Sequence, residues 1–232
     1  QGGGGFNTYE PIARAGIYGH IKRLFSHGEG AVRSRVCNLI GNMCRHSAFF
    51  YNALDRHGLI QPLIQRCSDP DKTTRKFACF AIGNAGFHSA ALYEALRPCV
   101  APLVALLRPE EEEKTRANAA GALGNLVRNS SQLCGELIKS GALQALLATA
   151  QMPEQRSGSG GGVSDGSSPV KIALFSLGNM CAYRECKEEL ISLGVWDVIH
   201  RLSSNPDPVQ QKYLIRIQNK LQGGSAPAPS YR

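Results

Sequence analysis

The chain has 232 residues, of which 43% are apolar, 7% aromatic and 19% charged, and its net charge is +8. The apolar residues are therefore mainly aliphatic and small, which suits close helix packing better than a sheet sandwich. No apolar run reaches the roughly 18 residues that a membrane-spanning helix needs. The positive charge permits an acidic surface or a nucleic acid as partner but selects neither.

The two ends of the chain carry linker-like sequence. Four glycines follow Gln1, and a stretch rich in Gly, Ser, Ala and Pro runs from Gly223 to Arg232. We interpret residues 1–11 as a Gly-rich linker and residues 222–232 as a disordered tail, because neither can build a packed core. The chain is therefore expected to be a piece of a longer protein.

Cysteine usage predicts a reducing, cytoplasmic environment. The chain has eight cysteines, no C-x-x-C pair and six histidines without ligand spacing. Most of the cysteines lie inside apolar helical patterns, where a free thiol behaves as a small hydrophobe. We therefore expect no metal, no cofactor and no catalytic residue in this chain.

The dipeptide Gly-Asn recurs along the chain at residues 41–42, 83–84, 124–125 and 178–179, with spacings of 42, 41 and 54 residues. The longest spacing contains a Gly/Ser tract at 157–168. Each Asn ends an apolar stripe with i, i+3, i+4, i+7 periodicity, which is typical of a helix. The Gly before each Asn is unfavourable in a helix, and we expect a neighbouring helix to approach closely there.

A second landmark follows each Asn by 15 or 16 residues and precedes a short apolar helix. These landmarks are Gly58, Cys99, Gly141 and Gly194. Each unit is therefore predicted to contain a short helix, a break, a middle helix, a turn and a long helix. The predicted units are a partial one at 12–46 and full ones at 47–88, 89–129, 130–183 (with a loop at 153–168) and 184–221.

A period of this length without strands falls in the helical armadillo or HEAT range. Three helices per unit, with a long third helix that ends in Leu123-Gly124-Asn125-Leu126 or Leu177-Gly178-Asn179-Met180, resemble the armadillo repeat. The implied fold is an all-α armadillo-type solenoid of about four and a half three-helix repeats over residues 12–221. Residues 74–85, Leu96-Arg97-Pro98 and residues 122–126 look like the C-terminal armadillo region of Fused-family serine/threonine kinases.

The Fused resemblance implies several properties that the residues themselves do not show. Any kinase domain would lie upstream, outside this chain. The implied settings are hedgehog-type signalling, the central pair of the ciliary axoneme and microtubule-linked cytokinesis. The implied partners are kinesin, tubulin or another ciliary or cytoskeletal protein. The implied location is the cytoskeleton or cilium.

The asparagine ladder, formed by Asn42, Asn84, Asn125 and Asn179, is the main candidate site. In armadillo proteins this residue faces a concave groove, and its amide offers donors and an acceptor to the backbone of an extended peptide. Alternatively, each Asn ties its repeat to a neighbouring backbone group.

One turn before the ladder asparagines lie Asn38, Phe80, Gly121 and Phe175. Phe80 and Phe175 are expected to form side-chain pockets, unless they belong to the core. The lack of Trp at this position disfavours a nuclear import receptor.

Cations recur near the start of the predicted long helices: Arg33, Arg35, Arg75, Lys76, Arg116 and Lys171. They suggest a basic stripe suited to an acidic peptide or an acidic tubulin tail; alternatively they pair with local acids.

The predicted function is a non-catalytic scaffold that binds an extended partner segment. The alternatives are an armadillo adaptor unrelated to kinases and a basic solenoid that grips nucleic acid, although few aromatic residues are available to stack bases.

Overall fold

The computed structural model describes residues 9–153 and 168–223. In chain order its helices are α1 (Glu10–Arg14), α2 (Tyr18–Leu24), α3 (Gly30–Cys44), α4 (Tyr51–Arg56), α5 (Ile60–Gln65), the 3₁₀ helix η1 (Arg66–Ser68), α6 (Lys72–Ala85), α7 (Tyr93–Leu96), the 3₁₀ helix η2 (Arg97–Cys99), α8 (Val100–Ala105), α9 (Glu113–Asn125), α10 (Cys134–Lys139), α11 (Ala142–Ala150), α12 (Pro169–Met180), α13 (Arg184–Ser192), α14 (Val195–Leu202) and α15 (Pro208–Gln222).

Helices and the turns between them account for the whole described part of the chain, so the predicted all-α class is confirmed. Helix α1 begins at Glu10, slightly before the expected start at residue 12, because Pro11 suits the first turn of a helix. Most of the predicted Gly/Ser loop, linker and tail lies outside the described residues.

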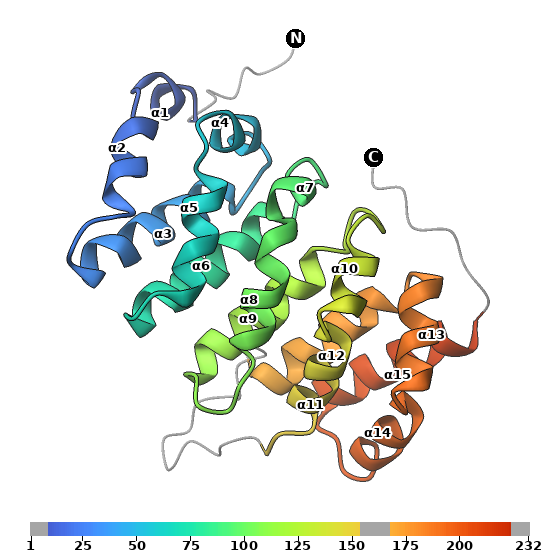
Figure 1. Cartoon of the computed structure of the whole chain (residues 1–232). Helices are drawn as coiled ribbons and strands as arrows, with labels where there is room; N and C mark the ends of the chain where they lie inside the picture. Colours follow the sequence, from blue (N-terminus) through green and yellow to red (C-terminus); the bar gives the residue numbers. More distant parts are fainter. Residues whose placement is uncertain (1–8, 154–167, 224–232) are drawn as a thin grey trace.

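The long helices α3, α6, α9, α12 and α15 pack against one another in that order. Figure 1 shows the units following one another from the blue N-terminal helices to the red C-terminal ones. Each unit contacts its sequence neighbours, as in a solenoid. The predicted armadillo-type stack is therefore confirmed.

Three of the four landmarks between short and middle helices are left-handed glycines. Gly58, Gly141 and Gly194 have φ angles of 64°, 70° and 75°, a region that residues with a Cβ rarely adopt. The fourth landmark, Cys99, lies instead at the end of η2, and Pro98 lies within the single turn of this 3₁₀ helix. The second full repeat therefore turns from α7 into α8 through a 3₁₀ helix.

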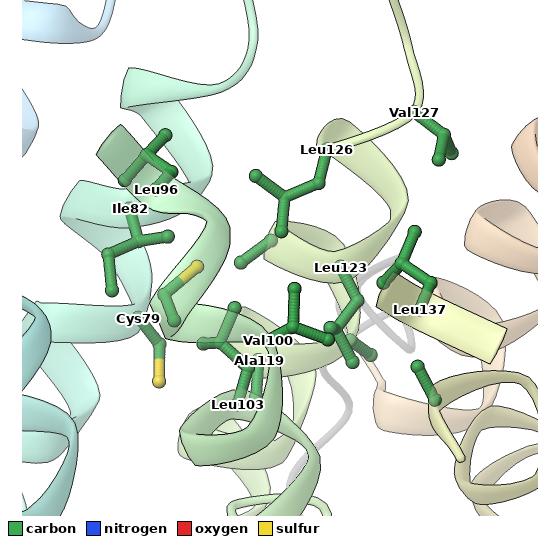
Figure 2. Close-up of a cluster of buried hydrophobic side chains, with 14 of the residues drawn as sticks. Cys79, Ile82, Leu96, Val100, Leu103, Ala119, Leu123, Leu126, Val127 and Leu137 are labelled. Atoms are coloured by element: carbon green, nitrogen blue, oxygen red, sulfur yellow. The ribbon is translucent and has the colours of Figure 1, made fainter. Parts of the chain in front are cut away.

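The hydrophobic core runs continuously through the stacked units. Figure 2 shows Cys79 and Ile82 from α6 close to Leu96, Val100 and Leu103, with side chains of α9 and α10 beyond them. A single unit cannot bury its apolar faces alone, so stacking supplies much of the stability. All eight cysteines are buried free thiols within this core.

Candidate functional site: a groove along the long helices

Three members of the asparagine ladder donate a side-chain N–H to the long helix of the preceding repeat. Asn84 Nδ2 lies 2.9 Å from Gly41 O, and Asn125 Nδ2 lies 2.9 Å from Gly83 O. Asn179 Nδ2 lies 3.2 Å from Gly124 O. Each Asn thus binds the carbonyl of the Gly that precedes the previous Asn. These bonds lock the register between neighbouring repeats.

The first position of the ladder differs because no long helix precedes α3 in the described part of the chain. The exposed amide of Asn42 donates to Asn38 Oδ1 of its own helix, at 3.3 Å. Both side chains therefore remain on the open side of the first long helix.

The last long helix replaces the Asn with cations. Lys220 Nζ on α15 lies 2.8 Å from Gly178 O, the carbonyl that a further Asn would bind. Arg216 donates to Asn179 Oδ1 at 2.8 Å. The amide of Asn179 is consequently bonded at both its nitrogen and its oxygen, and it is buried.

Asn84 and Asn125 retain bonding capacity toward the surface. Both are half-buried, and each structural bond uses one N–H of an amide that has two N–H groups and one oxygen. They line a cavity of about 180 Å³ between α6, α9 and α12, together with Cys79, Phe80, Gly83, Lys114, Ala117, Asn118, Gly121, Ala122 and Ile172. This cavity is the hollowed part of the candidate groove.

The two phenylalanines predicted to line side-chain pockets have different surroundings. The Phe80 ring lies above Gly41 and lines the cavity. The Phe175 ring is flanked by the Tyr213 ring at 5.7 Å and by the Arg216 guanidinium at 5.2 Å from its centroid. The groove is therefore open beside Phe80 and covered beside Phe175.

Most of the predicted basic stripe is engaged in contacts between repeats. Arg33, Arg75 and Lys171 pair with Asp69, Glu111 and Asp207 at 2.7, 3.0 and 2.9 Å, each acid lying 36 residues further along the chain. We call these three ion pairs the inter-repeat ion pairs. The alternative interpretation expected acidic partners close in sequence, but these acids come from the next repeat.

The other cations of the stripe are less uniform. Arg116 donates from one guanidinium nitrogen to Pro109 O and Glu111 O, both at 2.9 Å. Lys76 lies 4.0 Å from Glu112. Arg35 is exposed and forms no ion pair with any residue that the structure describes.

Some groove residues were missed at the sequence level. Asn118 donates to Lys76 O at 3.1 Å, and Lys114 and Ile172 line the same cavity. Asn118 precedes Asn125 by seven residues, so the i, i+7 helical spacing could have placed it on the ladder face.

Two tyrosine hydroxyls also bind the ends of the long helices. Tyr93 Oη donates to Asn125 O at 2.6 Å and accepts from the backbone N–H of Asn129 at 3.2 Å. Tyr51 repeats this arrangement with Asn84 O and the N–H of His88. Tyr51 and Tyr93 lie 42 residues apart, which equals the repeat length, so the sequence could have indicated their equivalent positions.

Two further properties of the described residues are their capacity to bind metal and the reactivity of their thiols. Within residues 9–153 and 168–223, no group of three or more His, Cys, Asp or Glu side chains could hold a metal ion. Burial raises the pKa of Cys37 and Cys44 to about 12, so these thiols stay protonated and unreactive at neutral pH. Within the same residues, no helix is both long and apolar enough to span a bilayer.

The family model for the armadillo/beta-catenin-like repeat matches residues 96–128, which run from the last residue of α7 to just beyond α9. A designed armadillo repeat protein in complex with the peptide (KR)4 superposes with a TM-score of 0.82 at 20% identity, covering 94% of this chain and 87% of that one. Computationally designed armadillo repeat proteins for modular peptide recognition give a TM-score of 0.73 at 18% identity, covering 87% of this chain and 80% of the other. The chain therefore has the armadillo-repeat fold.

A curated relative is the serine/threonine-protein kinase TIO of Arabidopsis thaliana, which is 43% identical over 225 residues. The match includes 94% of this chain but only 17% of the kinase. It confirms the resemblance to Fused-type kinases that the sequence motifs indicated.

Proposed function

We propose that this chain is a non-catalytic protein–protein interaction scaffold that binds an extended partner segment along the groove from Asn42 to Asn125. The observation that carries the proposal is the bonding state of Asn84 and Asn125. Each uses one amide N–H to hold the stack and keeps its second N–H and its oxygen at a half-buried cavity wall. A free donor and acceptor on one amide can pair with a peptide backbone.

The spacing of the ladder agrees with this mode of binding. Packed helices lie about 8–10 Å apart, which corresponds to about three extended residues at about 3.3 Å each. The cavity wall also carries Phe80 and Ile172 beside Lys114. An apolar side chain of the partner would enter beside Phe80, and an acidic one would lie near Lys114.

The test begins with a library of random peptides of about nine residues, the length of three helix spacings, panned against the immobilised chain. The affinity of the selected peptide is then measured with two variants. Asn84→Ala combined with Asn125→Ala is expected to weaken binding by at least about tenfold, since each loses hydrogen bonds to the peptide backbone.

Asn179→Ala is the matched control. Asn179 has the same stacking bond to a Gly carbonyl, but Arg216 occupies its oxygen. This variant is expected to lower the melting temperature while weakening peptide binding much less than the double variant does. Equal peptide affinity in the double variant and the unmodified chain, together with a lower melting temperature, would assign the ladder to stacking alone and refute the groove proposal.

We further propose that the scaffold belongs to a longer Fused-like kinase whose catalytic domain lies outside this chain. The similarity to TIO supports this. By family resemblance the scaffold would act in the cytoplasm at the cytoskeleton or the cilium, in hedgehog-type signalling, central-pair assembly or cytokinesis, with kinesin, tubulin or a related protein as partner. Proximity labelling of the full-length protein in cells tests this; labelling without cytoskeletal, ciliary or hedgehog-pathway proteins would contradict it.

A further inference from the structure

Three cations gather at the C-terminal end of the asparagine ladder, beyond the cavity. Lys187 lies on α13, and Arg216 and Lys220 lie on α15. Arg216 bonds Asn179 Oδ1 at 2.8 Å, and Lys220 bonds Gly178 O at 2.8 Å. Lys187 donates to Gly223 O at 3.1 Å, just after the end of α15. We call these three residues the cationic cluster.

The cationic cluster differs from the other cations of the long helices. The inter-repeat ion pairs neutralise Arg33, Arg75 and Lys171. By contrast, no carboxylate lies within ion-pair distance of Lys187, Arg216 or Lys220 anywhere in the part of the chain that the structure describes. Their bonds all go to neutral oxygens, so the charges remain unbalanced.

The surroundings of the cationic cluster make its unpaired positive charges unfavourable. Lys220 is half-buried, and desolvation together with the nearby charges of Arg216 and Lys187 lowers its pKa. The partial negative charge at the C-terminal end of α12 favours cations there, but a helix terminus carries only about half an elementary charge. An anion bound among the three side chains would balance the remaining positive charge of the cationic cluster.

Resting on the proposed function, we infer that the cationic cluster is the anchor for acidic side chains of the groove ligand, a protein segment rich in Asp or Glu. The cluster continues the ladder face, because Arg216 contacts Asn179 directly and stacks on Phe175. A segment lying along Asn42, Asn84 and Asn125 would therefore extend its acidic end over α12 toward α15. The groove ligand thus has a defined direction, with its charged end at the C-terminal repeat.

The probe for this inference is hexaglutamate, titrated calorimetrically into the whole chain at low ionic strength, where screening is weak. The variant that combines Lys187→Gln and Lys220→Gln is expected to bind it about tenfold more weakly, as is typical when close charge pairs are lost. Lys187→Gln alone, which does not touch the contact between α12 and α15, is expected to weaken binding about threefold with an unchanged melting curve.

The matched control combines Lys139→Gln and Lys212→Gln, which removes the same charge from exposed positions on α10 and α15. It is expected to bind hexaglutamate like the unmodified chain. Equal weakening in the control would show diffuse attraction to a positive surface and overturn the inference. Absence of binding by the unmodified chain would also overturn it.

One variant distinguishes a failure of the groove proposal from a failure of the inference about the cationic cluster. Asn84→Ala combined with Asn125→Ala is expected to leave hexaglutamate binding unchanged, because those amides lie in the central groove and not at the cluster. Loss of peptide binding with retained hexaglutamate binding in this variant supports both proposals. If this variant still binds both the selected peptide and hexaglutamate, the groove proposal is refuted, whereas anion binding by the cationic cluster is retained.

Discussion

At the scale of the residue, a ladder asparagine holds two repeats together, and we propose that the same amide also binds the ligand. The amide of Asn125 holds Gly83 O with one N–H and still lines the cavity. Asn179 shows the limit of this arrangement, because Arg216 takes its remaining acceptor. The same residue type in the same register therefore differs in its unpaired amide groups according to what the next repeat places beside it.

The glycines before the ladder residues differ in how closely the next helix approaches. A Cβ on Gly124 would lie 2.6 Å from the Ser176 Cβ and 2.8 Å from its Cα, whereas a Cβ on Gly83 would lie 3.5 Å from the Ala122 Cα. Gly124→Ala is expected to lower the free energy of unfolding by about 1–3 kcal/mol through overpacking. Gly83→Ala is expected to raise it by up to about 1 kcal/mol through helix propensity.

Urea unfolding of the two glycine variants, followed by circular dichroism, checks this difference. The two sites are matched, because each Gly directly precedes a ladder Asn in a long helix. Equal changes in unfolding free energy for both variants would contradict the close approach of α12 to α9.

The Tyr93 hydroxyl is expected to contribute measurably to the end of α9. Tyr93→Phe leaves Asn125 O and the Asn129 N–H without this partner, and it should lower the free energy of unfolding by about 1–3 kcal/mol. Tyr18→Phe is the control, since the buried Tyr18 hydroxyl has no hydrogen-bond partner among the described residues. It should be neutral or slightly stabilising in the same urea titration.

At the scale of the element, periodicity predicted the long helices and their partners correctly because these signals are local. Each Gly-Asn lies near the end of one apolar stripe, and Gly58, Gly141 and Gly194 mark turns by their own backbone conformation. The inter-repeat ion pairs were not predicted, since their members lie 36 residues apart and meet only when repeats stack. Lys220 as a substitute for Asn was also missed, because no local signal distinguishes it from a solvated lysine.

The inter-repeat ion pair of Asp69 predicts acid sensitivity. Burial raises the pKa of Asp69, but hydrogen bonds from Arg33 and the Asp71 N–H and the charges of Arg33 and Arg66 outweigh it and hold the pKa below its usual value. A lowered pKa in the folded state stabilises the fold above the unfolded-state pKa of about 3.9. This stabilisation is lost as the pH falls below that value through the lowered pKa.

Asp69→Asn is therefore expected to remove this part of the acid dependence and to lower the free energy of unfolding at pH 7 by about 3–5 kcal/mol, the typical effect of breaking a buried pair. Unfolding measured from neutral to acidic pH tests both effects. Glu110→Gln is the control, because Glu110 is exposed and forms no ion pair with the described residues, and it should leave the curve unchanged. An acid transition of Asp69→Asn identical to that of the unmodified chain would contradict the assignment.

At the scale of the whole molecule, the cavity of the candidate groove and the cationic cluster lie in different parts of the stack. Structural pairing uses most cations at the starts of the long helices, while the cationic cluster at α13 and α15 stays without carboxylates among the described residues. The net charge of +8 is therefore unevenly placed along the solenoid. The chain spans 17% of the length of TIO.

The most direct measurement of the central claim is the response of the side-chain amide signals in a ¹⁵N-labelled sample to the peptide selected by panning. The account predicts that the signals of Asn84 and Asn125 shift, while that of Asn179, already bonded at both ends, moves little. Shifts confined to the short and middle helices, with Asn84 and Asn125 unaffected, would contradict the account.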